Sequence, residues 1–193
     1  MIKVSKDLSK QRSVNSLCNQ DNKKDKIIEI FNYSCNGCYD LQRYMFFWKK
    51  SDLLIKKQLN NYYIPINLYS YWFFLSKAYY TSVRLNTIDL FHQNIFFNIH
   101  YNNIYDHKVD NIKTYFENNN VDEKIFFKTI NSFTILKDIK NTSFIKKDLF
   151  LSETPSIIIC LRNKIFILTL PKQSTSTIPI VNELNDILSH SKK

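Results

Sequence analysis

The sequence lacks a long apolar segment. Nowhere in its 193 residues is there an uninterrupted apolar run of about 18 residues, the length that a transmembrane helix needs. Residues 1–26 contain basic side chains but no apolar core of the kind that defines a secretory signal peptide. The sequence therefore predicts no membrane-spanning helix. It also shows no export signal, so we expect that the signal is absent, that it has been removed, or that the start of the sequence is wrongly assigned.

A clustered basic patch is also missing. The formal net charge is +10, but the lysines are spread along the chain, whereas phosphate recognition uses a concentrated footprint. The residue usage is rich in Lys and Asn and holds one glycine and four prolines, a skew typical of an AT-rich coding sequence. We therefore interpret the charge as a solvated surface and expect no nucleic-acid partner.

The chain has too few paired ligands for an obvious zinc site. Cys35 and Cys38 form a C-x-x-C pair, but Cys18 and Cys160 stand alone, and the histidines are scattered at positions 92, 100, 107 and 190. Structural zinc usually needs a second closely spaced Cys or His pair. We expect no metal and no cofactor, with a zinc protein kept as a lesser alternative. Cys160 is most simply a small buried apolar residue, and a Cys18–Cys160 disulfide stays open.

Apolar patterns predict alternating elements in a chain that is 44% hydrophobic and 23% charged. Residues 27–33 form a β-branched and aromatic run of strand length, and residues from 36 to about 50 have helical spacing. A second strand is expected over 62–69, near a sheet edge because Pro65 cannot donate to a ladder.

The middle of the chain has helical periods and few strand patterns. Helices are expected over 71–85, 88–99, 109–116 and 121–139, with Asp89 and Asp122 as caps. Two strands over 156–160 and 165–169 then predict a hairpin, and 178–189 predicts a closing amphipathic helix. The chain divides into a polar N-terminal arm or edge segment (1–26), a first α/β part (27–69), an inserted helical domain (70–150) and a second α/β part (151–193).

The cysteine pair lies where a strand gives way to a helix. Unpaired N–H groups and the partial positive charge of a helix N-terminus stabilise a thiolate. Cys35 is therefore expected to be the exposed nucleophile. Cys38 lies one turn deeper on the same helical face, where its sulfur can attack a mixed disulfide at Cys35.

Two segments resemble the DsbA family of thiol:disulfide interchange proteins. Residues 28–39, IEIFNYSCNGCY, are similar to the family's strand with an acidic residue followed by Cys-Pro-His-Cys-Tyr, and Thr154-Pro155 before Ser156 is similar to its cis-proline loop. The element order over residues 27–190 also matches. The resemblance implies an α/β, thioredoxin-like fold with an inserted helical domain.

The same resemblance implies roles for individual residues. Cys35 would be the nucleophile and Cys38 the resolving cysteine of a redox-active disulfide. Pro155 would hold a cis peptide bond beside the pair, and the Thr154 backbone would pair with an extended substrate. Glu29 would be a buried acid beneath Cys38 that helps to move its proton. The duller alternatives are an inert structural bridge, a trans Pro155 and a solvent-facing Glu29.

One departure from the family motif concerns the redox potential. Asn36-Gly37 replaces Pro-His between the cysteines, so Cys35 loses an imidazole that helps to stabilise its thiolate. We expect the pKa of Cys35 to lie above the family's very low value and the pair to be a weaker oxidant than DsbA.

These observations favour a monomeric thiol:disulfide oxidoreductase that introduces or exchanges disulfides in unfolded or reduced protein substrates. By resemblance, a membrane redox partner would reoxidise the pair, and the location would be the periplasm. The main rival is a redox-weakened binding or chaperone module with the same fold.

Overall fold

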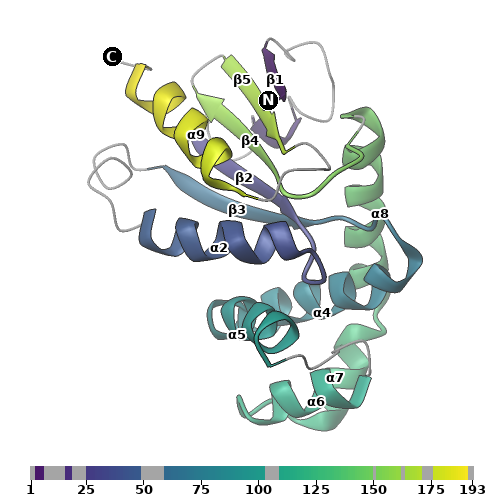
Figure 1. The fold of residues 1–193 in the computed structure, drawn as a ribbon. Helices are drawn as coiled ribbons and strands as arrows, with labels where there is room; N and C mark the ends of the chain where they lie inside the picture. Colours follow the sequence, from purple (N-terminus) through teal and green to yellow (C-terminus); the bar gives the residue numbers. More distant parts are fainter. Residues whose placement is uncertain are drawn as a thin grey trace.

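A computed structural model describes residues 3–6, 16–18, 25–48, 59–102, 109–149, 151–161, 164–170 and 176–190. Its sheet has the strand order β1-β5-β4-β2-β3 (Figure 1). The strands are β1 (Lys3–Lys6), β2 (Lys26–Phe31), β3 (Asn60–Pro65), β4 (Ser156–Leu161) and β5 (Lys164–Thr169). Strands β2 and β3 run parallel, and the other neighbouring pairs are antiparallel.

The central strands are rich in apolar residues because both of their faces are covered. Every residue of β2 and β4 is buried, which is the pattern expected for strands with protein on both sides. Ile28 pairs with Ile158 across them. Strand β3 lies at the edge and ends at Pro65, which confirms the predicted edge position.

Helices cover the sheet and extend beyond one end of it (Figure 1). They are α2 (Asn36–Trp48), the 3-10 turn η1 (Ser70–Trp72), α4 (Phe73–Arg84), α5 (Ile88–His100), α6 (Val109–Glu117), α7 (Glu123–Ile130), α8 (Phe133–Asp148) and α9 (Ile178–His190). Leu41 of α2 and Leu184 of α9 pack on Ile27 and the same face of the sheet. Ile28 and Ile30 point to the opposite face, where Leu149, just after α8, joins their cluster.

A third core joins the sheet to the helical insertion. Phe31, Tyr33 and Cys38 are buried in one cluster with residues of α4, α5, α6 and α7. The end of β2 and the start of α2 therefore lie where the two halves of the molecule meet.

The element order agrees with the sequence prediction, but several boundaries differ. The second strand covers 60–65 rather than 62–69, and the stretch 121–139 holds two helices, α7 and α8, with a break at Asn131-Ser132. Asp122 caps α7 as predicted, accepting hydrogen bonds from the backbone N–H groups of Lys124 and Ile125. Asp89 is not a cap, because the cap of α5 is Thr87.

The N-terminal segment contributes an edge strand, which agrees with the edge alternative for residues 1–26, although the sequence pattern did not predict a strand at these residues. Lys3–Lys6 pairs antiparallel with β5, and residues 16–18 form a helical turn. The other residues of the predicted arm, apart from Asp25 and Lys26, lie outside the described residues, as do residues 49 and 50 at the predicted end of the first helix.

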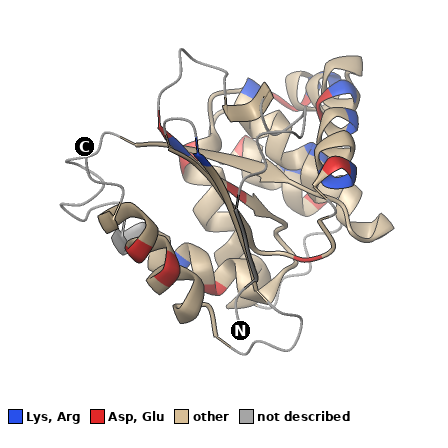
Figure 2. Cartoon of the chain, turned by 90° about the horizontal axis from the view of Figure 1, so that it is seen from above, with Lys and Arg blue, Asp and Glu red and all other residues tan. Residues whose placement is uncertain are grey.

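Charged residues are distributed over several elements. Lys and Arg positions, like Asp and Glu positions, lie on several elements of the cartoon (Figure 2). Among the described residues, none of the helices combines the length and apolar character that crossing a membrane requires.

Candidate active site

Asn32 shapes the loop between β2 and α2. Its buried side-chain amide donates to the Ile66 carbonyl at 3.3 Å, and its side-chain oxygen accepts from the Ser34 N–H at 3.0 Å. Its own carbonyl accepts from the Cys35 N–H at 3.1 Å. Asn commonly stabilises such turns through its side chain. The turn places Cys35 directly before the first residue of α2.

The two cysteines of the pair lie with their sulfur atoms 2.6 Å apart and are not bonded. The Cys38 thiol donates to Cys35 Sγ, and the Cys38 backbone N–H also points at Cys35 Sγ, at 3.2 Å. Cys35 is partly exposed, whereas Cys38 is fully buried. Only the first sulfur is open to an incoming substrate.

Their surroundings shift the two thiols in opposite directions. The hydrogen bond from Cys38 lowers the pKa of Cys35, against the effect of burial, with help from Thr154 and the backbone N–H groups of Gly37 and Cys38. Burial raises the pKa of Cys38 well above its usual value, and Cys35 adds to the effect. Cys35 is thus the better thiolate, and Cys38 holds its proton.

The loop before β4 lies against the cysteine pair. The Thr154-Pro155 peptide bond is cis, and the Thr154 carbonyl oxygen is 3.4 Å from Cys35 Sγ. A Cβ atom at position 37 would lie 3.1 Å from Pro155 Cδ, tighter than ordinary packing. Gly37 is therefore needed for close approach, a role that the sequence indicated only through its being the single glycine.

Glu29 points from β2 toward α2. The carboxyl group accepts a hydrogen bond from Gln42 Nε2 at 2.8 Å, and the residue is only 2% exposed. Its charge is among the smaller causes that raise the pKa of Cys38, after burial and the contacts with Cys35. The solvent-facing alternative for Glu29 is wrong, because β2 is covered on both faces.

Solved structures share this arrangement of sheet, insertion and helices. A DsbA variant from Pseudomonas aeruginosa aligns with a TM-score of 0.73 at 15% identity over 89% of each chain. DsbA from Xylella fastidiosa aligns with a TM-score of 0.72 at 18% identity over 86% of each chain. The chain has the DsbA fold. No protein-family model matches the sequence, and comparison with curated proteins finds no relative.

A third neighbour with the DsbA fold was solved with a peptide. Proteus mirabilis DsbA, in a complex with the non-covalently bound peptide PWATCDS, aligns with a TM-score of 0.58 at 18% identity, over 86% of this chain and 89% of that one. At these identities the likeness establishes the fold, while the chemistry has to be argued from the residues present.

Two histidines of the insertion contact Tyr33 in the loop between β2 and α2, and the sequence analysis gave neither of them a role. His100 Nε2–H donates to the Tyr33 carbonyl at 2.7 Å, and its ring stacks on Tyr39 with centroids 4.9 Å apart. Burial lowers the pKa of His100. His92 contacts the Tyr33 hydroxyl. Both lie about a third of the chain away from Tyr33 in sequence, so no local pattern pairs them with it.

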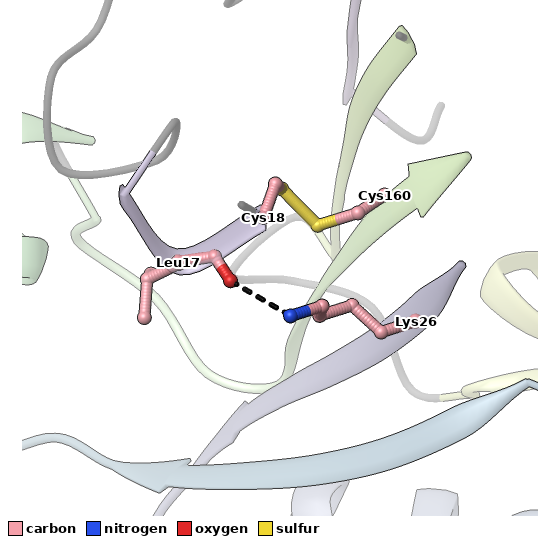
Figure 3. The surroundings of a disulfide bond; sticks show 4 residues. All are labelled: Leu17, Cys18, Lys26 and Cys160. Carbon is pink, nitrogen blue, oxygen red and sulfur yellow. Dashed lines mark hydrogen bonds between the residues drawn. A yellow bond between two sulfur atoms is a disulfide. The ribbon is translucent and has the colours of Figure 1, made fainter. Parts of the chain in front are cut away.

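The remaining cysteines form a disulfide outside this site (Figure 3). Cys18 is bonded to Cys160 with Cα atoms 5.6 Å apart and a sequence separation of 142. Beside it, Lys26 Nζ donates to the Leu17 carbonyl at 3.1 Å. The interpretation of Cys160 as a free apolar residue is wrong, although the residue is buried. The disulfide fixes the segment before β2 onto β4 of the DsbA fold.

No cluster that suggests a metal centre occurs in the described ranges. No group of three or more His, Cys, Asp or Glu residues there is placed to hold an ion.

Proposed function

We propose that the chain is a thiol:disulfide oxidoreductase that acts on protein substrates through a mixed disulfide at Cys35. The observation that carries the proposal is the asymmetry of the pair. The partly exposed thiol has the lowered pKa, and the buried thiol, 2.6 Å away, has the raised one. This is the division of roles that exchange requires, because one sulfur must meet the substrate and the other must resolve the intermediate.

When the pair is oxidised, a substrate thiolate attacks Cys35 Sγ. The Cys35–Cys38 bond breaks, a substrate–Cys35 disulfide forms, and Cys38 leaves as a thiolate that takes up a proton. A second substrate thiolate then attacks the substrate sulfur of the mixed disulfide, which forms the substrate disulfide and releases Cys35 as a thiolate. The lowered pKa of Cys35 makes it a good leaving group in this last step.

Glu29 is the proposed proton donor and acceptor for Cys38. It is buried on the α2-facing side of β2, and its charge acts on Cys38. A carboxyl group suits this task because it can both accept and release a proton.

The proposed substrates are extended segments of reduced or unfolded proteins. The Thr154 carbonyl lies beside Cys35 Sγ, and the proposal is that backbone groups of this loop pair with a peptide in strand-like fashion. The solved complex of Proteus mirabilis DsbA with a peptide supports a peptide as the substrate. By the same likeness we propose a periplasmic, monomeric protein whose pair is reoxidised by a membrane redox partner.

Serine substitutions test the proposal. Cys35→Ser should abolish turnover in the oxidative refolding of a reduced, disulfide-containing protein, because no mixed disulfide can form. Cys38→Ser should instead accumulate the mixed disulfide, detected by mass spectrometry as substrate bound to Cys35. Cys18→Ser is the control for loss of a cysteine outside the pair and should retain turnover. Equal turnover by Cys35→Ser and the unmodified chain would refute the proposed function.

A binding module is the second candidate, favoured by exposed aromatic side chains at the start of α4. Tyr69, Tyr71 and Phe73 are each more than two-fifths exposed, while Trp72 between them is buried. A chaperone would keep its effect on substrate aggregation in Cys35→Ser, whereas a catalyst loses its turnover.

A further inference from the structure

A buried imidazole lies behind the cysteine pair and has no part in the steps above. His92 on α5 is 5% exposed. Its ring centroid is 4.3 Å from that of Tyr63 and 5.0 Å from that of Phe31. Buried polar groups in native proteins are hydrogen-bonded, and His92 Nδ1 lies 2.9 Å from the Tyr33 hydroxyl oxygen. The contact with Tyr33 therefore helps to hold the imidazole in place among aromatic rings.

Tyr33 allows His92 to exist in either charge state. Burial raises the pKa of Tyr33 well above its usual value, and the charges of Tyr79 and Glu29 add to the effect, so the phenol keeps its proton. The Tyr33 O–H donates to Nδ1 of a neutral imidazole, and the Tyr33 oxygen accepts from Nδ1–H of a charged one. Neither state leaves this contact unsatisfied.

His92 also contacts two residues that neighbour Glu29 in the sheet. Tyr63 is the β3 neighbour of Glu29 in the parallel register, and Phe31 is the next residue on the same face of β2. The His92 ring contacts both. The charge of Glu29 in turn acts on Tyr33 and on Cys38. One buried region thus extends from the Cys38 thiol past Glu29 to His92.

We propose that His92, held by Tyr33, is a positioning residue that sets the proton affinity of Glu29 and thereby the rate at which Cys38 resolves a mixed disulfide. This role rests on the proposed function and deepens it. In the resolving step the Cys38 proton goes to the Glu29 carboxylate and the Cys38 sulfur attacks Cys35 Sγ. The Cys35–Cys38 bond forms while the bond to the substrate breaks, and the substrate leaves as a thiolate.

The sign of the effect follows from charge. An imidazole that takes up a proton stabilises the Glu29 carboxylate, so Glu29 stays ionised and able to accept a proton at neutral pH. Without the imidazole, Glu29 holds its own proton to higher pH. In the described part of the chain, the titratable side chains whose rings lie against His92 are Tyr33 after β2, Tyr63 on β3 and Tyr79 on α4. On α2, Cys38 is buried in the same cluster as Tyr33 and Tyr79.

The experiment measures resolution directly. A disulfide reagent that releases a coloured aromatic thiol, 5,5′-dithiobis(2-nitrobenzoate), is mixed with the reduced chain. The first release forms a mixed disulfide at Cys35, and the second reports the attack by Cys38. The rate of the second release is followed by stopped flow between about pH 5 and about pH 9, a range that spans the titration of imidazole.

We expect His92→Phe to slow the second release about tenfold at neutral pH, a smaller decrease than complete loss of a general base would cause. The midpoint of the pH–rate profile should move to higher pH. Tyr33→Phe, which removes one oxygen atom, should move it in the same direction by a smaller amount. Tyr79→Phe is the matched control. It removes a hydroxyl from the same core, where it donates to the Tyr63 carbonyl rather than to His92, and should leave the profile in place.

An unchanged pH profile in His92→Phe would overturn the inference, as would an equal displacement in Tyr79→Phe. If His92→Phe does not fold, Tyr33→Phe decides the matter, and an unshifted profile there overturns the role. An unmodified chain that releases only the first thiol contradicts the proposed function itself, which separates the two failures.

Discussion

At position 37 the need for glycine comes from contact rather than from backbone conformation. Its backbone φ is not in the left-handed region, and α-helical positions ordinarily favour alanine over glycine. The close approach of Pro155 explains why no side chain is present. To carry the imidazole that the DsbA motif has at this place, position 37 would need Pro155 to shift by a few tenths of an ångström.

Restoring that imidazole should change the redox potential. Gly37→His is expected to lower the pKa of Cys35 and stabilise the reduced form, shifting the equilibrium with glutathione by about tenfold, or roughly 30 mV, toward a stronger oxidant. Gly37→Ala is the control, because it adds the crowding against Pro155 without adding an imidazole. It should shift the equilibrium with glutathione much less. The two variants are compared by titration in glutathione buffers. A Gly37→His pair no more oxidising than Gly37→Ala, or an unmodified pair already as oxidising as DsbA, would contradict this explanation.

Single residues of the site differ in how far sequence could predict them. Cys35 and Cys38 are three residues apart in sequence and lie at a strand-to-helix transition, so local pattern was sufficient to find them. The pairing of Asn32 with Ile66, and of Tyr33 with His92, depends on elements far apart in sequence. Those contacts follow from tertiary packing, which periodicity does not encode.

At the scale of elements, the helix starts in the insertion depend on particular caps. Asp122 and Asp89 both occupy places that the sequence marks as helix starts, but only Asp122 accepts backbone hydrogen bonds as a cap. The difference arises because α5 begins at Ile88, which puts Asp89 inside its first turn. An offset of two residues, as between Asp89 and the observed cap Thr87, lies below the resolution of a hydrophobic period.

The two aspartates therefore make a matched pair for a stability test. Asp122→Ala should lower the free energy of unfolding by about 1 kcal/mol, because two N–H groups of α7 lose their acceptor. Asp89→Ala removes only a favourable charge near a helix N-terminus and should have a smaller effect. Chemical denaturation of both variants checks the order. Equal losses would show that the Asp122 hydrogen bonds contribute nothing beyond charge.

Strand and helix order was predictable because each apolar run matches one period over its whole length. The edge strand β1 was not, since Lys3–Lys6 has only one apolar side chain, and its pairing partner β5 lies at the other end of the chain. The division of 121–139 into α7 and α8 was also missed. The apolar spacing continues across Asn131-Ser132, whereas the helical conformation of the backbone is interrupted there.

For the whole molecule, the Cys18–Cys160 disulfide is the main covalent constraint. It closes a loop over a sequence separation of 142, and in the chain-entropy model longer loops restrict the unfolded state more. Sequence alone could not choose it over two free cysteines, because the partners approach only once the segment before β2 lies on the sheet.

Removing this disulfide should affect stability rather than chemistry. Cys18→Ser/Cys160→Ser is expected to lower the free energy of unfolding by about 2–5 kcal/mol, as measured by urea denaturation, with turnover at Cys35 retained in the folded protein. As the comparison, the unmodified chain is alkylated at Cys35 and Cys38. This sample shows the effect on stability of losing the thiols of the other pair. A double variant as stable as the unmodified chain would show that the bond does not hold the fold.

The disulfide also determines what a protease can separate. The insertion lies between Cys18 and Cys160, so a backbone cut anywhere within it leaves two fragments that stay joined by the bond. One fragment carries Cys35 and Cys38, and the other carries Thr154 and Pro155. A nicked chain would keep both halves of its candidate site on one covalent assembly until a reductant released them.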